Sequence, residues 1–509
     1  MTTMTFPSVR TDGLTLILGL GETGVAAARW CARHGAALRV LDTREAPGGL
    51  DVLRRELGDA QVDYRLGSDG FEASALQDVH TIVLSPGLAP GQEPQRSFLE
   101  LARAGRVEII GEIELFARAL ADMSSQGYRP KVLAVTGTNG KTTVAAMTRR
   151  LLEAGGLRAR AAGNISPAAL DALRDALDED ALPDAWVLEL SSFQLEAVHS
   201  LKADAGAVLN VTQDHLDWHG SMQAYAAAKA RLAGMSDVMV VNRDDELTVA
   251  MVANLDARNV RSFGRSAPVL EGDMGLEASD GIVWLAAAEA DDFDLPAPTP
   301  KRGRKAVEAP RAPGRMRRLM PADALRVRGQ HNALNALAAL ALARCLGLGW
   351  AGLLNGLRDY AGEPHRTEFV RSIAGVDFIN DSKGTNVGAT VAALEGMDEP
   401  VVLIAGGQGK GQDFAPLAKA VRGHAKAVLL FGQDAGLIQA ALAGAGVPLE
   451  RVDGLQAAVE RGFELAGEGD SVLLSPACAS LDMFPNYKVR GARFMDAVQE
   501  LALNRGEVA

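Results

Sequence analysis

The decapeptide AVTGTNGKTT, residues 134–143, decides the interpretation of this chain. A short apolar run leads into its glycine-rich turn, and a helical pattern, Val144–Leu152, follows directly. This order predicts a strand, a phosphate-binding loop and a helix. The glycines let backbone N–H groups converge on phosphate oxygens, Lys141 adds a charge, and the hydroxyl of Thr142 can reach a metal ion. The loop is a short variant, because Val135 stands where the common G-x-x-x-x-G-K-[ST] pattern has its first glycine. An ordinary strand–helix turn with a surface lysine is the less favoured alternative.

Length and composition narrow the classes of protein that fit. A chain of 509 residues is too long for one hydrophobic core, so several domains are expected. The net charge of −12 argues against a nucleic-acid partner. The three cysteines form no C-x-x-C motif, which fits a reducing cytoplasm and indicates neither disulfides nor structural zinc. The N-terminal residues lack a signal-peptide pattern, and the longest apolar stretch, residues 333–357, carries polar residues that favour buried helix over an integral membrane span.

Alternating strand and helix patterns predict an α/β protein with three domains. We expect a Rossmann-like N-terminal domain over residues 1–120, a central phosphate-loop domain over residues 121–361, and a C-terminal doubly wound domain over residues 362–509. A helix at 111–120, followed by a linker at 121–130, would join the first two domains. Residues 295–321 are rich in proline and arginine, which predicts a flexible insertion in the central domain.

A second glycine-rich turn, GLGETG at Gly19–Gly24, follows the first predicted strand. Asp42 ends the next strand, near the distance expected in a dinucleotide-binding unit. Such a turn receives a pyrophosphate, and the acid meets a ribose or base edge. NAD and other nucleotide diphosphates, UDP included, fit this geometry equally, and a turn without a ligand is the alternative.

Polar residues end two further strands of the central domain. Glu189, in LELSSFQLE, could hold Mg²⁺ between nucleotide phosphates, or it could be a strand-end acid facing water. His215 and His219, in NVTQDHLDWHG, could form a zinc pair, but the sequence offers no third ligand nearby, so solvated loop histidines are favoured. Lys229 shares a predicted helix face with Tyr225 and by pattern alone is a surface cation.

Three loops of the C-terminal domain follow apolar strands: NDSKGTN (380–386), AGGQGKGQDF (405–414) and LSPACASLDMFPNYKVRG (474–491). Loops of this kind at strand ends build ligand pockets. Lys383 and Lys410 are placed to hold a dicarboxylate or a polyphosphate.

The ordered set of motifs resembles the Mur ligases of peptidoglycan synthesis. TGTNGKTT, ELSSFQLE, NVTQDHLD, GQHNALNALAA, PHRTE, NDSKGTN and LSPACASLDMF all occur in order, over nearly the whole chain except residues 295–321. TGTNGKT alone would fit any ATP-dependent Mur or folylpolyglutamate ligase. The GLGETG turn, Asp42-Thr43-Arg44, Ser85-Pro86-Gly87 and the C-terminal loops are most similar to the members that add glutamate.

The resemblance implies a cytoplasmic, monomeric ligase that uses ATP and two Mg²⁺ ions to join D-glutamate to UDP-N-acetylmuramoyl-L-alanine through an acyl phosphate. For the UDP-sugar it implies Gly21, Glu22, Thr23, Asp42, Thr43, Arg44, Ser85, Gly87 and Asn164. For ATP it implies Gly137, Thr138, Asn139, Gly140, Lys141, Thr142, Thr143, Asn332, Asn335, Arg366 and Asp381. For glutamate it implies Lys383, Thr385, Lys410, Ser480, Leu481 and Tyr487.

The resemblance also assigns the metal ligands and the catalytic residues. The metal ligands would be Thr142, Glu189, His215 and Lys229, the lysine being carbamylated so that its added carboxylate binds Mg²⁺; the catalytic residues would be Lys141, Glu189, His215 and Lys229. Two positions depart from the family pattern. Glu22 stands where an apolar residue is expected, and Thr367 replaces the phenylalanine of PHRFE.

Three other functions stay open on the residues alone. GLGETG with Asp42 would suit an NAD-dependent oxidoreductase, although that leaves the phosphate loop unexplained. A non-catalytic nucleotide switch would leave Glu189 and the C-terminal loops without a role. A sister ligase with another amino acid, such as a folylpolyglutamate synthase, shares the central motif.

Overall fold

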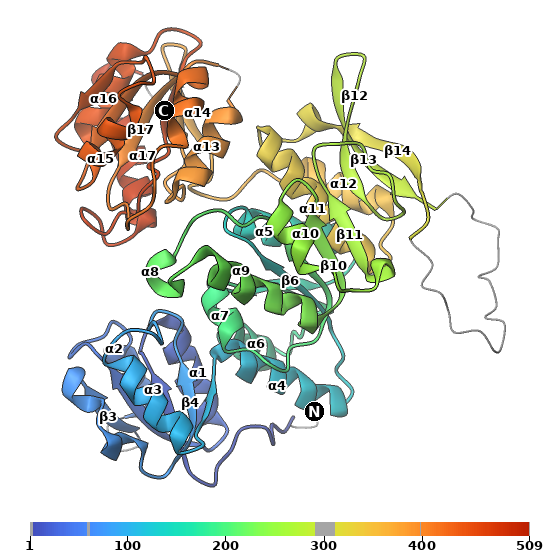
Figure 1. The fold of residues 1–509 in the computed structure, drawn as a ribbon, viewed down its shortest axis with the longest axis vertical. Coiled ribbons are helices and arrows are strands. Elements are labelled where there is room, and N and C mark those ends of the chain that lie inside the picture. Colours follow the sequence, from blue (N-terminus) through green and yellow to red (C-terminus); the bar gives the residue numbers. More distant parts are fainter. Residues whose placement is uncertain (1–3, 59–61, 291–310, 398, 508–509) are drawn as a thin grey trace.

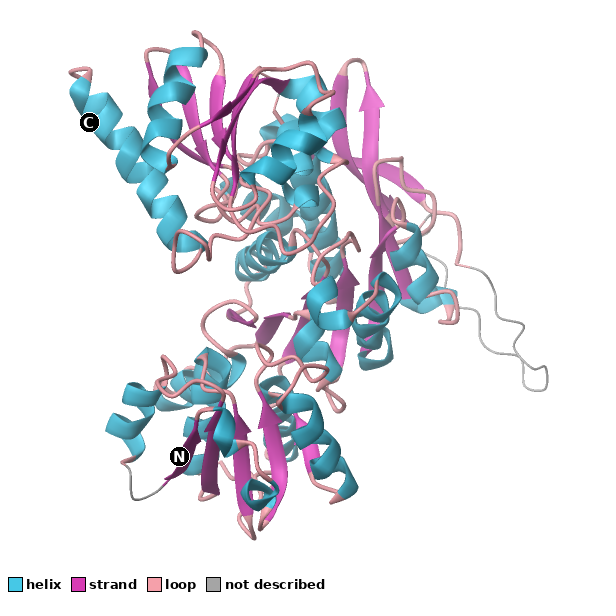
Figure 2. Cartoon of the chain, turned by 60° about the vertical axis from the view of Figure 1, so that its left-hand side comes forward, coloured by secondary structure: helices cyan, strands magenta, loops and turns pink. Residues whose placement is uncertain are grey.

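The computed structural model describes residues 4–58, 62–290, 311–397 and 399–507. The chain forms three successive lobes, coloured blue, green to yellow, and orange to red in Figure 1, with the central lobe in contact with both others. Each lobe contains a parallel or mainly parallel β-sheet between helices, which Figure 2 shows as magenta strands among cyan helices. The predicted three-domain α/β architecture is therefore confirmed.

The first domain is a five-stranded parallel sheet in the order β3-β2-β1-β4-β5. Both faces of this sheet are buried. Ile17 packs in the cluster that contains helix α1, while Leu16 and Leu18 pack in the cluster that contains α3. This explains why the first strand, LTLIL, is apolar almost throughout instead of alternating with polar residues. The elements are β1 Leu14–Leu18, α1 Glu22–Arg33, β2 Ala37–Asp42, α2 Leu50–Leu57, β3 Val62–Leu66, β4 Val79–Leu84, α3 Gln95–Ala104 and β5 Glu108–Ile110.

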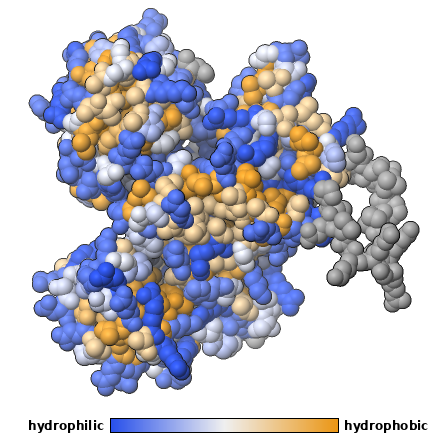
Figure 3. Space-filling model, in the orientation of Figure 1, coloured by the Kyte–Doolittle hydropathy of each residue, from blue (hydrophilic) through white to orange (hydrophobic). Residues whose placement is uncertain are grey.

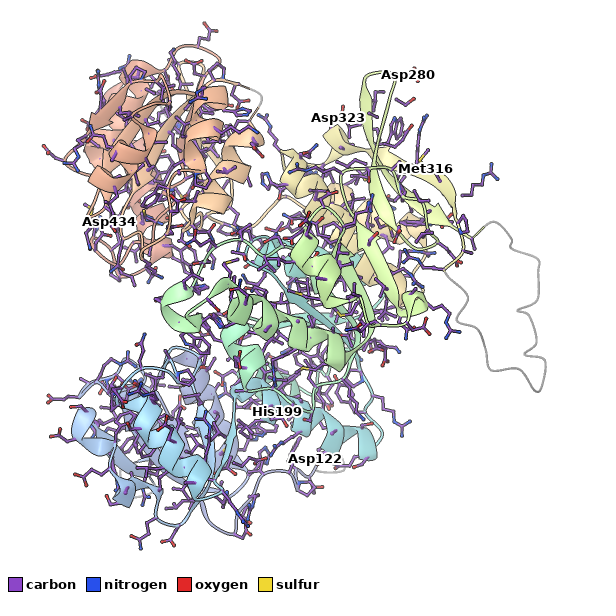
Figure 4. All side chains as sticks on the ribbon, in the orientation of Figure 1. Asp122, His199, Asp280, Met316, Asp323 and Asp434 are labelled. Atoms are coloured by element: carbon purple, nitrogen blue, oxygen red, sulfur yellow. The ribbon has the colours of Figure 1, made fainter. Side chains whose placement is uncertain are left out.

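Helix α4, Glu112–Ser125, joins the first domain to the central one. It is longer than the helix expected from the sequence and takes in the first half of the expected linker. The helix packs against α1 of the first domain and α6 of the central domain, which also contact each other. Asp122, near its end, accepts hydrogen bonds from the backbone and hydroxyl of Ser8, and Glu114 accepts one from the backbone of His199; Figure 4 labels Asp122 and His199 at this junction.

The central sheet has six parallel strands in the order β11-β10-β9-β6-β8-β7. Strand β6 therefore lies between β9 and β8, so the loops that follow these three strands meet at one edge. Helices α11 and α12 pack against α5 and bury its apolar face. The elements are β6 Lys131–Thr136, α5 Lys141–Ala154, β7 Ala159–Gly163, α6 Ala169–Asp178, β8 Ala185–Glu189, α7 Ser192–Glu196, β9 Ala203–Val208, α8 Leu216–His219, α9 Met222–Ala230, β10 Ser236–Asn242, α10 Glu246–Met251, β11 Val260–Phe263, α11 Gln330–Cys345 and α12 Trp350–Asp359.

A three-stranded antiparallel sheet is attached to the central domain and corrects one prediction. Its strands are β12 Met274–Ser279, β13 Ile282–Glu289 and β14 Arg315–Pro321. The expectation of a flexible insertion over residues 295–321 is wrong for β14, which pairs with β13 along its length; residues 295–310 lie outside the described residues. Composition misled the prediction because arginines of β14 bind acids on the other two strands of this sheet: Arg317 pairs with Glu289 of β13 and Arg318 with Glu277 of β12. Figure 4 labels Met316 on this strand.

The third domain is a doubly wound sheet in the order β15-β16-β20-β17-β18-β19, in which only β15 runs antiparallel to its neighbour. Its two faces are covered by separate apolar clusters. The three polar loops found in the sequence follow β16, β17 and β20, which are adjacent strands, so these loops lie side by side. The elements are β15 Glu368–Ile373, β16 Val376–Asn380, α13 Val387–Glu395, β17 Val401–Gly406, α14 Leu417–His424, β18 Ala425–Phe431, α15 Ala435–Leu442, β19 Leu449–Arg451, α16 Leu455–Leu465, β20 Ser471–Leu474 and α17 Tyr487–Asn504.

The surface seen in Figure 3 is mainly hydrophilic, with apolar side chains visible on all three lobes. No helix within the described residues is both long and apolar enough to cross a bilayer.

Candidate functional site

One cavity of about 1160 Å³ is lined by residues of all three domains. It brings together side chains that are far apart in the sequence. The first domain contributes Gly21, Glu22, Thr23, Asp42, Thr43, Arg44, Ser85 and Gly87, the central domain Thr142 and Asn164, and the third domain Arg366, Lys383 and Tyr487. All nine residues expected at the UDP-sugar site line this cavity. Of the residues expected at ATP and glutamate, only Thr142, Arg366, Lys383 and Tyr487 do.

The glycine turn of the first domain is held by Asp42. Its buried carboxylate accepts hydrogen bonds from the backbone N–H of Leu20, at 2.8 Å, and from the backbone and guanidinium of Arg44. Burial alone would raise the pKa of Asp42, but these hydrogen bonds and the charge of Arg44 outweigh it and lower the pKa. Asp42 is therefore an ionised anchor that fixes the turn and aims Arg44 at the cavity.

Glu22, the first departure from the family pattern, has a structural partner. Its carboxylate accepts a hydrogen bond of 2.6 Å from the hydroxyl of Ser166, which belongs to the loop between β7 and α6 of the central domain. The acid thus links the wall of the first domain to the wall of the central domain across the cavity.

The predicted phosphate loop connects β6 to α5 and depends on a glycine at position 140. Gly140 has φ = 84°, and a Cβ there would lie 2.6 Å from Oδ1 of Asn335. Lys141 begins α5, and its Nζ donates to the carbonyls of Gly137 and Thr138, at 2.8 and 2.7 Å. Burial lowers the pKa of Lys141. The lysine lies folded over the loop at the helix N-terminus, where backbone N–H groups favour an anion.

Lys229 on helix α9 is buried, with 1% of its surface exposed, so its interpretation as a surface cation is wrong. Its Nζ donates to the carbonyl of Gly137 at 2.9 Å and lies 4.3 Å from the ring centroid of Tyr225. Burial, reinforced by the charge of Lys141, lowers the pKa of Lys229 well below its usual value. The lowered pKa favours the neutral amine relative to an exposed lysine, and a neutral amine is the form that reacts with carbon dioxide.

Glu189 ends strand β8 beside the phosphate loop and has one free carboxylate oxygen. Asn164 donates to Oε1 at 2.8 Å, while Oε2 is buried without a hydrogen-bond partner. A buried carboxylate oxygen without a partner is costly unless a cation or donor reaches it. An oxygen ligand of this type suits Mg²⁺. In the described chain no three His, Cys, Asp or Glu side chains form a ready-made metal cluster, so a metal ion here would also need ligands from a phosphate or water.

His215 follows β9 in a left-handed conformation, with φ = 54°. Its ring packs on Phe193 and lies 3.6 Å from the carboxylate of Asp214. Burial lowers the pKa of His215, so the neutral ring is available as a metal ligand. His219 does not pair with it as a zinc site, because its Nε2 hydrogen-bonds the hydroxyl of Ser192 at 2.8 Å.

The remaining residues expected at ATP lie around the phosphate loop. Arg366, from the chain that enters the third domain, donates to the hydroxyl of Thr142. Asn335 lies against Gly140 and donates to Asn332. Asp381 accepts from the hydroxyl of Ser475 and from the backbone of Thr367, and burial raises its pKa to about 6. Asp381 therefore supports the loop that carries Arg366 and does not itself line the cavity.

Two residues expected at glutamate, Lys383 and Tyr487, line the cavity together. The Nζ of Lys383 lies 4.0 Å from the Tyr487 ring centroid, and burial lowers its pKa to about 8. The other four do not line it: Thr385 lies on the same loop as Lys383, and Lys410, Ser480 and Leu481 lie on the two neighbouring loops. These loops are joined, since Gln408 pairs with Ala479 as an isolated bridge and Asp434, labelled in Figure 4, accepts from the backbone of Gly409.

Sequence reasoning missed two residues that organise this region. Arg490 is fully buried and donates to Ser382 and to the carbonyl of Cys478, which ties two of the polar loops together. Asn386 reaches from the third domain to the phosphate loop, where its amide pairs with that of Asn139. Both lie inside motifs that the sequence had marked, but only the packing of distant segments reveals their partners.

Comparisons with known proteins agree with this geometry. Three family models match the chain: the Mur ligase MurD-like N-terminal domain over residues 14–111, the Mur ligase middle domain over 135–292, and the Mur ligase glutamate ligase domain over 365–478. The UDP-N-acetylmuramoylalanine–D-glutamate ligase of Bordetella bronchiseptica is 65% identical over 498 residues, which cover 97% of this chain and 98% of that protein. Its counterpart from Ralstonia nicotianae is 54% identical over 492 residues, 96% of this chain and 97% of that protein.

Solved structures show the same fold at low sequence identity. The UDP-N-acetylmuramate–alanine ligase of Thermotoga maritima matches with a TM-score of 0.55 and 20% identity, over 96% of this chain and 99% of that one. The MurF ligase of the same organism, solved in complex with ADP, matches with a TM-score of 0.55 and 15% identity, over 99% and 98%.

Proposed function

Because the chain belongs to the Mur ligase family, as its family-model matches and its 65% identity to a relative over 97% of its length show, we propose that it is an ATP-dependent ligase that joins D-glutamate to UDP-N-acetylmuramoyl-L-alanine. One observation carries this proposal. A single cavity joins the glycine turn of the first domain, the hydroxyl of Thr142 and the Lys383–Tyr487 pair. A nucleotide sugar, a triphosphate terminus and an amino acid could therefore meet at one place.

The nucleotide end of the sugar would lie on the first domain. The N-terminus of α1 and the turn before it offer backbone N–H groups to a diphosphate, and Arg44, held by Asp42, adds a positive charge. Asn164 lies between this turn and the phosphate loop, beside Glu189. The substrate would thus extend from the first domain to the edge of the central sheet, with its carboxylate near Thr142.

The reaction needs the substrate carboxylate to be activated, because hydroxide is a poor leaving group. We propose that a carboxylate oxygen attacks the γ-phosphorus of ATP, which forms an acyl-phosphate bond and breaks the bond to ADP. The D-glutamate ammonium loses a proton, its nitrogen attacks the carbonyl carbon, and inorganic phosphate leaves with the bonding electrons. The positive charges of Lys141 and Arg366, both at Thr142 or next to it, would stabilise charge on the transferring group.

Magnesium would neutralise the nucleotide phosphates when bound. The residues present fit it: Glu189 offers an oxygen without a partner, Thr142 a hydroxyl, His215 a neutral ring, and Lys229 a carboxylate if it is carbamylated. Two ions, a cytoplasmic location and a monomeric state are part of the same proposal and rest on the family resemblance.

The incoming glutamate would meet the loops of the third domain. Lys383 lines the cavity, and its charge suits one carboxylate; Tyr487 forms the wall beside it. Arg490, buried behind these loops, holds them at a fixed spacing. An acyl phosphate hydrolyses in water, so closure of the three domains that line the cavity would protect it.

The deciding experiment measures phosphate release from ATP with UDP-N-acetylmuramoyl-L-alanine and either enantiomer of glutamate. We expect release that needs all three substrates and strongly prefers the D-enantiomer. Release with a folate substrate instead, or nicotinamide reduction without ATP consumption, would overturn the proposal.

A further inference from the structure

Asn386, in the third domain, makes direct contact with the phosphate loop of the central domain. Its Nδ2 donates to Oδ1 of Asn139 at 3.1 Å, and Nδ2 of Asn139 donates back to Oδ1 of Asn386 at 3.3 Å. The same Nδ2 of Asn386 donates to the carboxylate of Asp214 at 3.2 Å. Asn386 is 4% exposed, so water competes little for these hydrogen bonds.

The orientation of the Asn386 side-chain amide is determined by the partners of its oxygen and of its nitrogen. Its Oδ1 must be an acceptor, because it caps helix α13 by accepting the backbone N–H of Ala389 at 2.9 Å. Its Nδ2 must be a donor, because Asp214 offers only carboxylate oxygens. One side chain therefore caps its own helix and at the same time holds two segments of another domain.

The two central-domain segments that Asn386 contacts include the residues to which the proposed function assigns catalysis. Asn139 lies two residues before Lys141, and Asn210 binds it from the central domain by donating to its carbonyl and accepting from its backbone N–H. Asp214 accepts from the backbone N–H of His215. Asn386 is thus one hydrogen bond away from the phosphate loop and from the turn that orients His215.

The close approach of α13 supports this reading. A Cβ on Gly388, in the first turn of the helix, would lie 3.2 Å from Oγ1 of Thr212 and 3.3 Å from Nδ2 of Asn139. The first turn of α13 therefore lies against the two central-domain loops with little room for a larger side chain.

We propose that Asn386 is a positioning residue through which the third domain sets the phosphate loop and the Asp214–His215 turn for phosphoryl transfer. This inference rests on the proposed ligase function. It gives the chain a means to couple the placement of the amino-acid domain to the alignment of Lys141, because the contact exists only when α13 lies against the loop.

The test uses two substitutions that keep the helix cap. Asn386→Ser retains an oxygen for the Ala389 N–H but has no amide, and Asn386→Asp retains the size and the cap while losing the N–H donors. We expect kcat to fall about 10- to 100-fold in both, the size expected when a hydrogen bond to a charged group is lost, with the KM for the UDP-sugar unchanged. Asn504→Asp, an exposed position near the end of α17, is the matched control for the added charge and should leave kcat unchanged.

A second readout does not depend on turnover. Hydrogen–deuterium exchange of the peptides around residues 137–143 and 210–215 should become faster in both Asn386 variants and stay at the wild-type rate in Asn504→Asp. Gly388→Ala, which keeps Asn386 and favours helix, should also lower kcat without lowering the melting temperature. A role that is merely structural would lower the melting temperature and move KM and kcat together.

Unchanged kcat and unchanged exchange in Asn386→Ser would overturn the inference. So would a loss of activity that follows a fall in melting temperature with no faster exchange at residues 137–143. Absence of phosphate release by the wild-type protein would instead overturn the proposed function, and the exchange experiment would still decide the role of Asn386.

Discussion

The two glycine-rich turns of this chain share a strand–turn–helix scaffold but differ in charge. In the first domain the carboxylate of Asp42 is paired with Arg44 and accepts the backbone N–H of Leu20 in the turn. In the central domain Lys141 and Lys229 both donate to carbonyls of the phosphate loop, and in the described chain no carboxylate lies within ion-pair distance of either amine. The charges of the first turn are therefore paired within the protein, which suits a turn that binds a substrate without reacting with it. The second turn carries Lys141 with no described carboxylate beside it, a charge that a polyphosphate would pair with, which is where chemistry is expected.

Among the substitutions that test this difference between the two turns, the loss of Lys141 should have the largest effect on activity. We expect Lys141→Ala to lower kcat by at least about 10³-fold, because the charge that faces the transferring phosphoryl group is lost. Binding of the UDP-sugar should remain nearly intact, since its expected contacts lie on the first domain. Phosphate release and calorimetric titration with the UDP-sugar would measure the two effects, with exposed Lys202→Ala as the control. A normal rate of phosphate release would contradict the assignment.

A substitution of Lys229 tests whether the phosphate loop also needs a carbamylated lysine, whose added carboxylate would bind Mg²⁺. Since burial lowers its pKa, the neutral amine that adds to carbon dioxide is present at a lower pH than in an exposed lysine. Lys229→Ala should lose activity by about 10²-fold or more, and short carboxylates should restore part of it. Full activity of the unrescued variant, measured by phosphate release at fixed Mg²⁺, would exclude carbamylation as a requirement.

These two lysines also show how far the sequence could predict the site. The phosphate loop, the strands around it and the glycine turn of the first domain follow from local patterns, because each needs only neighbouring residues. The burial of Lys229 and the contact between Asn386 and Asn139 depend on segments 92 and 247 residues apart, and no local pattern contains that information. Strand β14 was missed for a related reason, since its arginines pair with acids on other strands.

A substitution of Asp42 tests the glycine turn of the first domain, and we expect it to change substrate binding more than turnover. Asp42→Asn should raise the KM for the UDP-sugar about tenfold through a misplaced Arg44, with kcat little changed, and should lower the free energy of unfolding at pH 7 by about 2 kcal/mol.

The contribution of Asp42 to the free energy of unfolding should depend on pH in a defined direction. The folded-state pKa of Asp42 is lowered, so its stabilisation is complete above the unfolded value of about 3.9 and is lost as pH falls through the folded value. Denaturant unfolding of wild type and variant should therefore differ at pH 7 and converge in strong acid. A constant difference at every pH would show that the carboxylate charge is not responsible.

Glu112 is a buried carboxyl group that, unlike Asp42, has no cation among the described residues beside it. Its substitution should have the smallest effect on turnover. Its Oε1 accepts the backbone N–H of Leu170, its Oε2 has no partner, and burial raises its pKa to about 8. Its contribution to stability is complete below the unfolded pKa of about 4.3 and is lost as pH rises through about 8. Glu112→Gln should leave kcat unchanged and make the protein more stable than wild type at pH 8 by on the order of 2 kcal/mol, as measured by denaturant unfolding. Equal stability of the two proteins at pH 5 and pH 8 would contradict this.

The β13–β14 hairpin has a practical consequence for engineering. Glu289 and Arg315 face each other across the pair, and the bridge between Leu270 and Pro313 closes the base of the sheet. Glu289 and Arg315, the two points to which an inserted sequence would be joined, therefore lie next to each other. A fluorescent reporter or an affinity tag spliced in there would have both of its ends anchored, which offers a way to watch this catalyst at work while its termini stay untouched.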